Sequence, residues 1–131
     1  MSKESTRANQ RRSILVVDDD VLIRSMLSEF LRDEGYAVEE AESADEAKTL
    51  LAPPGVEYSL LISDVVMPGE MDGIQLAHWT RQNRPEIAVL LMSGYTGTTK
   101  GVAYPFIAKP CRFARLVEMA EQLIREKRVN A

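Results

Sequence analysis

The feature that most constrains this chain is a set of short apolar runs, each of which ends at a polar or charged side chain. These runs, with the groups that follow them, are residues 14–17 before Asp18, Asp19 and Asp20, residues 60–63 before Asp64, residues 89–92 before Ser93, and residues 106–108 before Lys109. Apolar runs without polar alternation are typical of strands that are buried on both faces of a parallel sheet. Because parallel strands end at the same edge of a sheet, we expect the polar groups to gather there, where open α/β sheets bind ligands.

The segments between these runs predict helices and one further strand. We expect strands at residues 14–17, 36–40, 58–63, 87–92 and 106–108, and helices at residues 21–33, from the cap Ser43 to about 51, from about 74 to Pro85, and at about 113–127. Glu46 lies three residues after Ser43, the spacing of a capping box. Residues 94–105 are rich in glycine and threonine and carry no apolar stripe, so a helix there is expected to be short or replaced by a loop.

Buried strands that alternate with amphipathic helices predict an α/β fold with right-handed crossovers. We expect a flavodoxin-like, doubly wound, five-stranded parallel sheet of order 2-1-3-4-5. The order reverses between strands one and three, so Asp18, Asp19 and Asp64 should meet at that point.

Length and charge exclude several classes of protein. A chain of 131 residues with 45% hydrophobic content makes one domain with a core, and 20 acidic against 16 basic residues argue against direct nucleic-acid binding. No run approaches the roughly 18 apolar residues of a membrane span, and the N-terminus lacks a signal-peptide core, so we expect a cytoplasmic protein. Residues 1–12 are polar and basic, so we expect a disordered tail ahead of a domain at residues 13–128.

Clustered carboxylates at the sheet edge predict a metal and a phosphate chemistry. Like charges brought together need a cation, and oxygen ligands without histidine or cysteine favour Mg²⁺. One carboxylate could then attack phosphorus as a nucleophile. Lys109 would neutralise charge on the phosphoryl group, and the Ser93 hydroxyl would donate a hydrogen bond to one of its oxygens.

In order and spacing, four segments resemble the receiver domains of two-component response regulators. They are Ile-Leu-Val-Val-Asp-Asp-Asp at 14–20, Ser-Asp-Val-Val-Met-Pro at 63–68, Met-Ser-Gly at 92–94 and Lys-Pro at 109–110. The resemblance implies that Asp64 accepts a phosphoryl group from a sensor histidine kinase or a histidine phosphotransfer protein. It also implies that Asp18, Asp19, Asp64 and the backbone carbonyl of Val66 hold Mg²⁺.

The same resemblance assigns the remaining site residues. Ser93 takes the place of the switch hydroxyl, Lys109 that of the ammonium group that contacts the phosphoryl group, and Pro110 would follow a cis peptide. Phe106 occupies the aromatic switch position but has no hydroxyl. The interval from Ser93 to Lys109 is shorter than usual, as in receivers that replace the fourth helix by a loop. We hypothesise that this loop orders on phosphorylation.

Four alternatives compete with this interpretation. A haloacid dehalogenase would use Asp18 and Asp20 but needs acidic ligands after a further strand, and it leaves Asp64 unexplained. A flavodoxin would place a loop like residues 95–99 after strand one, whereas here that loop follows strand four. A phosphorylation-independent binding module and a receiver segment of a hybrid histidine kinase stay open.

Several features are expected to carry no chemistry of their own. No enzyme activity is expected beyond the domain's own phosphorylation and dephosphorylation. No effector domain is expected after the last helix, so output should pass through another protein. Asp20 is expected to be a bystander and His78 to be solvated, while Cys111 is expected to pack near the start of the last helix.

Overall fold

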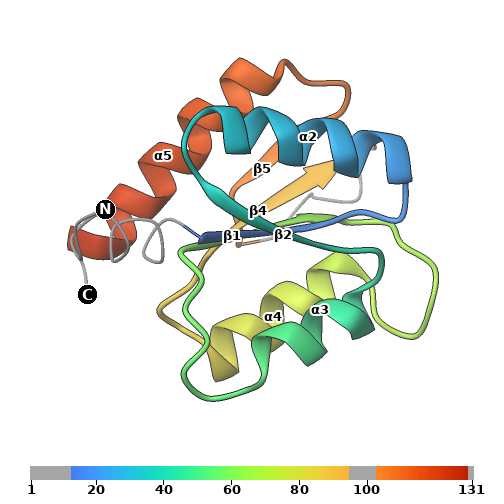
Figure 1. The fold of residues 1–131 in the computed structure, drawn as a ribbon. Helices are drawn as coiled ribbons and strands as arrows, with labels where there is room; N and C mark the ends of the chain where they lie inside the picture. The colour runs from blue at the N-terminus through green and yellow to red at the C-terminus, as the bar shows by residue number, and fades with distance from the viewer. Residues whose placement is uncertain (1–12, 95–102, 130–131) are drawn as a thin grey trace.

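The computed structural model describes residues 13–94 and 103–129, and the expectations for the tail at residues 1–12 and for most of the 94–105 loop lie outside them. Five parallel strands form one sheet of order β2-β1-β3-β4-β5, which confirms the predicted topology (Figure 1). The strands are β1 (Ser13–Val17), β2 (Ala37–Ala41), β3 (Leu60–Asp64), β4 (Ala88–Ser93) and β5 (Phe106–Ala108). The three central strands, β1, β3 and β4, are buried along almost their whole length, as expected for strands covered on both faces.

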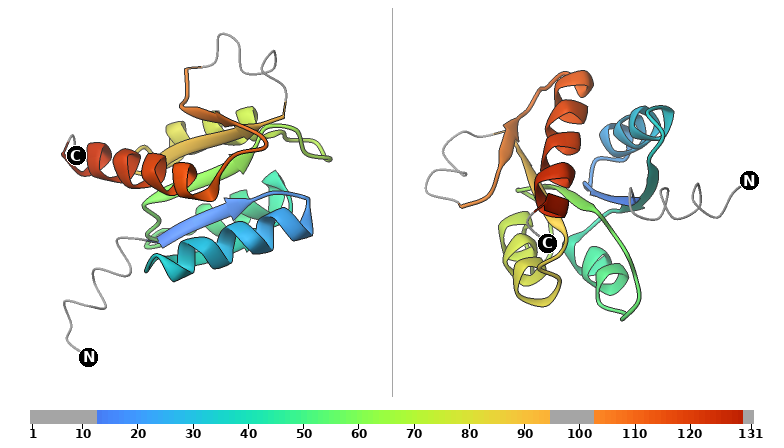
Figure 2. Two further views of the ribbon diagram at one scale, coloured as in Figure 1. Left: turned by 90° about the horizontal axis from the view of Figure 1, so that it is seen from above. Right: turned by 90° about the vertical axis from the view of Figure 1, so that its left-hand side faces the viewer.

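Helices cover both faces of the sheet. The helices α2 (Val21–Asp33) and α5 (Phe113–Val129) lie on one face, and α3 (Ala44–Leu51) and α4 (Gly73–Asn83) lie on the other (Figures 1 and 2). Alternate strand residues therefore enter two cores. Leu15 and Leu61 belong to the core under α3 and α4, whereas Val16 and Ile62 belong to the core under α2 and α5.

Side chains that precede the helices fix where they begin. Asp20 caps α2 by accepting hydrogen bonds from the backbone N–H groups of Leu22 (3.0 Å) and Ile23 (3.1 Å), so it is more than the bystander that the sequence predicted. The predicted cap Ser43 accepts a bond from the Glu46 N–H at 3.1 Å. Asp72 and Gln75 form a complete capping box at the start of α4, with both hydrogen bonds at 2.8 Å.

Strands β2, β3 and β4 begin one or two residues later than expected, and each ends one residue later. The reason for the later ends lies in the pairing of the strands. Asp64 pairs with Met92 in the register of β3 and β4, so this aspartate belongs to the strand instead of following it. Its backbone is therefore held by the sheet, whereas a loop residue would be less constrained.

The connection from β4 to β5 contains no helix in its described residues, 94 and 103–105. Two backbone hydrogen bonds join the strands at its ends, from the Leu91 N–H to the Pro105 carbonyl (3.0 Å) and from the Lys109 N–H to the Ser93 carbonyl (2.7 Å). Among the described residues, no helix is long and apolar enough to cross a membrane.

Candidate functional site

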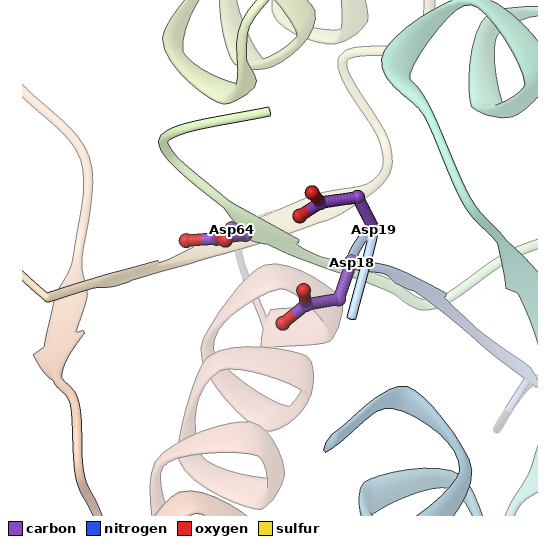
Figure 3. A group of neighbouring side chains, drawn as sticks. All are labelled: Asp18, Asp19 and Asp64. Atoms are coloured by element: carbon purple, nitrogen blue, oxygen red, sulfur yellow. The ribbon is translucent and has the colours of Figure 1, made fainter. Parts of the chain in front are cut away.

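Three carboxylates meet at the carboxyl edge of the sheet, where the sequence predicted them. Asp18 and Asp19 follow β1, and Asp64 ends the neighbouring strand β3. Each contributes a carboxylate oxygen to a group in which all oxygens lie within 4.8 Å of one another (Figure 3). Asp18 is fully buried, Asp64 is 8% exposed and Asp19 is exposed. The cluster therefore has a buried base and one side open to solvent.

The Lys109 ammonium group joins two of these carboxylates. Its Nζ lies 2.9 Å from Oδ2 of Asp18 and 3.2 Å from Oδ2 of Asp64. Asp18 also accepts a hydrogen bond at 2.9 Å from the backbone N–H of Asp20. Lys109 follows β5, and the peptide bond between it and Pro110 is cis, as the resemblance implied. Residues 18, 64 and 109 are thus brought together from three separate strands.

Burial and charge act in opposite directions on the titration of these groups. Burial raises the pKa of Asp64 and the neighbouring Asp18 charge raises it further, while the Lys109 ammonium lowers it without cancelling the rise. For Lys109, burial alone would lower the pKa, but the hydrogen bond to Asp18 and the charge of Asp64 outweigh burial and raise it. The ammonium group therefore stays charged beside the carboxylates.

The backbone of Asp64 is approached closely by Gly73, a contact that the sequence did not predict. The Gly73 N–H at the start of α4 donates a hydrogen bond to the Val65 carbonyl at 2.9 Å. A Cβ atom at position 73 would lie 1.9 Å from the Asp64 carbonyl oxygen, so only glycine fits. The signal available in the sequence was a glycine directly after the helix cap Asp72.

A second missed residue, Arg24, reaches the site from α2. Its Nη1 donates a hydrogen bond to the Asp18 carbonyl at 2.7 Å, and its Nε lies 3.2 Å from Oε1 of Glu40 in β2. Nothing in the local pattern marked Arg24, because it is one of several charged residues on an amphipathic helix.

The structure places the other predicted residues as follows. Ser93 ends β4 and is 2% exposed, and the Lys109 N–H bonds its carbonyl. Phe106 begins β5 opposite Leu91 and is 42% exposed, so its ring stands partly in solvent. Val66 lies two residues beyond Asp64. The switch roles of Ser93 and Phe106 and the metal contact of the Val66 carbonyl stay predictions.

A separate polar cluster lies away from the carboxylates, where α4 meets the end of the β4–β5 connection. His78 Nδ1 and the Tyr104 hydroxyl share a hydrogen bond at 2.6 Å, and the Arg81 guanidinium lies 4.3 Å from the centre of the Tyr104 ring. Tyr104 itself is 5% exposed. His78 is exposed, as the sequence predicted, and it forms this hydrogen bond in addition. Cys111 packs against the core under α5 as predicted, and burial raises the pKa of its thiol.

The carboxylate cluster fits a hard divalent cation. All three ligand groups are oxygen donors that converge without rearrangement of the strands, which is the donor set that Mg²⁺ prefers. Among the described residues the cluster contains Asp18, Asp19 and Asp64 but not Asp20, which caps α2. The pair of acids that a haloacid dehalogenase would need is therefore not assembled.

Relatives among characterised proteins are similar to this chain along most of its length. The sensor kinase CckA of Brucella abortus is 28% identical in an alignment 131 positions long, which covers 95% of this chain and 14% of that protein. The transcriptional regulatory protein FixJ of Bradyrhizobium diazoefficiens is 33% identical in an alignment 120 positions long, which covers 86% of this chain and 57% of that protein. The chain therefore spans less than two thirds of each of these relatives.

Solved structures show the same similarity. A CheY-like receiver domain protein from Methanospirillum hungatei superposes with a TM-score of 0.82 at 25% identity, covering 92% of this chain and 98% of that one. The response regulator TrrA of Thermotoga maritima, solved in complex with Mg²⁺ and BeF, has a TM-score of 0.76 at 31% identity and covers 86% and 98%. Residues 14–121 match the family described as the response regulator receiver domain, and the chain therefore belongs to that family.

Proposed function

We propose that Asp64 is the phosphoacceptor of this receiver domain and that Asp18, Asp19, Asp64 and the Val66 carbonyl bind Mg²⁺. The observation that carries the proposal is the Lys109 ammonium group, which lies 3.2 Å from Asp64 and 2.9 Å from Asp18 within a cluster of three carboxylates. A buried nucleophile, a metal-binding pair and a fixed cation are the parts that phosphoryl transfer to a carboxylate needs.

The residues divide the work of the transfer. A bound Mg²⁺ supplies positive charge to the phosphoryl oxygens. An oxygen of Asp64 attacks phosphorus while the bond from phosphorus to the histidine nitrogen of the donor breaks. Lys109 stabilises the charge that develops on the phosphoryl oxygens, and the Ser93 hydroxyl donates to one of them. The Asp64 side chain is only 12% exposed, so water has little access to its carboxyl carbon once the acyl phosphate has formed.

The phosphoryl donor in this proposal is a sensor histidine kinase or a histidine phosphotransfer protein. Exposed apolar side chains next to the carboxylates support a protein donor, since Val21 and Leu22 are 61% and 68% exposed and Val66 is 55% exposed. Because a histidine kinase takes its phosphoryl group from ATP, the proposal places the domain in the cytoplasm. Its output then passes through protein contacts, with no enzyme activity beyond its own phosphorylation and dephosphorylation.

The similarity to CckA favours a second arrangement, in which this domain is the receiver segment of a hybrid histidine kinase. CckA is named a sensor kinase, and the receiver domain of a hybrid histidine kinase CckA has a TM-score of 0.74 at 33% identity, covering 86% of this chain and 98% of that one. In either arrangement we propose that residues 13–128 form the domain and residues 1–12 a basic tail.

The intact mass of the protein after incubation with acetyl phosphate tests the proposal. We expect one added phosphoryl group in the wild type with Mg²⁺, none with excess chelator, and none in Asp64→Asn. Asp45→Asn is the matched control, because Asp45 is an exposed aspartate on α3 and should leave the adduct unchanged. Asp19→Ala should weaken Mg²⁺ binding, and Lys109→Ala should impair signalling more than folding.

Two results would contradict the proposal. A phosphoryl adduct that persists in Asp64→Asn would move the acceptor to another residue. A wild-type protein without an adduct and without detectable Mg²⁺ binding would favour the phosphorylation-independent binding module.

A further inference from the structure

Arg24 forms a link between the acidic turn and the neighbouring strand. Its Nη1 donates to the Asp18 carbonyl at 2.7 Å and its Nε lies 3.2 Å from Oε1 of Glu40. The Arg24 side chain is 14% exposed, so both contacts are shielded from solvent. One further bond joins this turn to β2, from the Asp18 N–H to the Ala41 carbonyl at 3.2 Å. The turn is thus attached to β2 at two points.

We propose that Arg24 is a positioning residue for the metal site, which it serves by holding the peptide group between Asp18 and Asp19. This inference rests on the proposed function, because it assumes that these aspartates bind Mg²⁺. Arg24 does not itself touch the ligand oxygens. It acts through the main chain that carries them.

The burial of Asp18 makes this contact consequential. Asp18 has no exposed surface, and Arg24→Met takes away the guanidinium donor while the methionine side chain still fills most of the space beside the carbonyl. A buried carbonyl without a donor is costly, and the peptide group would rotate to find a new partner. The same peptide group carries the N–H of Asp19, so its rotation would turn the Asp19 carboxylate away from Asp64. A Mg²⁺ site tolerates little displacement of its ligands, because that ion demands near-ideal octahedral geometry.

The charge of Arg24 and its proposed positioning role predict opposite effects of its removal on Mg²⁺ binding. An uncompensated guanidinium so close to the cluster would repel a divalent cation, so its removal would tighten binding. Glu40 is paired with Arg24 at 3.2 Å and offsets that repulsion. If positioning is the role of Arg24, its removal weakens binding instead. The sign of the change in Mg²⁺ affinity therefore separates the two roles.

The chain contains a matched control on the same helix. Arg32 also lies beside Glu40, at 3.5 Å, and also donates to a backbone carbonyl, that of Val38, at 2.9 Å. None of its hydrogen bonds is to Asp18. Arg32→Met therefore removes an arginine with comparable partners and leaves the acidic turn intact.

Calorimetric Mg²⁺ titration of the full chain tests the inference. We expect the Mg²⁺ Kd of Arg24→Met to rise about 10-fold, at the lower end of what the loss of an outer-shell contact costs, and that of Arg32→Met to stay within about twofold of wild type. The Mg²⁺ Kd of Arg24→Lys should lie between those of the two methionine variants. An ammonium group can replace one hydrogen bond of Arg24 but cannot reproduce the planar guanidinium, which makes two contacts at once. Thermal melting of each variant establishes that it is folded.

Each outcome has a defined meaning. A Kd for Arg24→Met equal to or tighter than wild type would overturn the inference alone. A wild-type protein that binds no Mg²⁺ would overturn the proposed metal site and this inference with it. If Arg24→Met does not fold, the Arg24→Lys variant tests the inference in its place. A higher Mg²⁺ Kd for Arg24→Lys than for wild type supports the positioning role, and an unchanged Kd refutes it.

Discussion

Replacement of Gly73 by alanine is the most direct test of how strand β3, which ends at Asp64, is held. The added Cβ would lie 1.9 Å from the Asp64 carbonyl oxygen, 2.8 Å from its carbonyl carbon and 2.9 Å from the Val65 Cα. Real Cβ atoms essentially never approach closer than 3.0 Å, and all three neighbours belong to the backbone. The start of α4 must therefore move away from β3, because no flexible side chain can give way.

The expected change in stability is the balance of one stabilising and two destabilising contributions. Glycine to alanine within a helix normally stabilises by roughly 0.5–1 kcal/mol. Overpacking against a fixed neighbour costs about 1–3 kcal/mol, and strain in the Gly73 to Val65 hydrogen bond adds about 1 kcal/mol. We expect Gly73→Ala to lose about 1–3.5 kcal/mol in the free energy of unfolding, which lowers Tm by roughly 3–17 °C for a domain of this size.

Urea unfolding followed by circular dichroism measures this loss as a shift of the midpoint at constant slope. Gly94→Ala is the control, because no atom of the described residues lies within 4 Å of the Cβ position there and its φ is not positive. Its free energy of unfolding should change by less than about 0.5 kcal/mol. A Gly73→Ala protein as stable as wild type would refute the argument from close approach.

Three further predictions concern single polar groups. Asp20→Ala should cost about 1 kcal/mol of unfolding free energy because α2 loses its cap, Asp20→Asn should recover most of it, and calorimetry should find Mg²⁺ affinity unchanged in both. Because burial raises the folded-state pKa of Asp64 above its unfolded value, wild-type stability should fall as pH rises through that folded pKa. Asp64→Asn should lack this fall and be the more stable protein at pH 7, and an identical pH profile in urea unfolding would contradict the assignment. Tyr104→Phe should lose about 1 kcal/mol through its bond to His78, and a double-mutant cycle with His78→Ala that shows no coupling would count against that bond.

Much of the fold was predictable because buried positions recur in the sequence with the period of the helix or strand that contains them. Helix α2 has the bounds that the pattern predicted, and β5 does as well. The meeting of Asp18 and Asp64 was predictable for a different reason, since strand order alone makes their strands neighbours. Both inferences need only local pattern and the rules of parallel sheets.

The parts that were missed depend on distances between elements. The clash at Gly73 arises from how closely α4 approaches the backbone of β3, and no local pattern encodes that distance. Arg24 looks like any charged helix residue until the helix is docked beside Asp18. The partners His78 and Tyr104 lie 26 positions apart, and only the packing of α4 against the end of the β4–β5 connection brings them together. Such contacts depend on how the elements pack, so they could not be predicted from the sequence pattern alone.

The register between β4 and β5 has a consequence for engineering this domain. Leu91, Met92 and Ser93 pair with Phe106, Ile107 and Ala108, so the ladder sets Lys109 beside Ser93 independently of the chain that connects the two strands. The length of that connection is therefore a free design variable. A peptide tag or a small sensing module inserted after Gly94 could change what the domain reports without redesigning the chemistry that it performs.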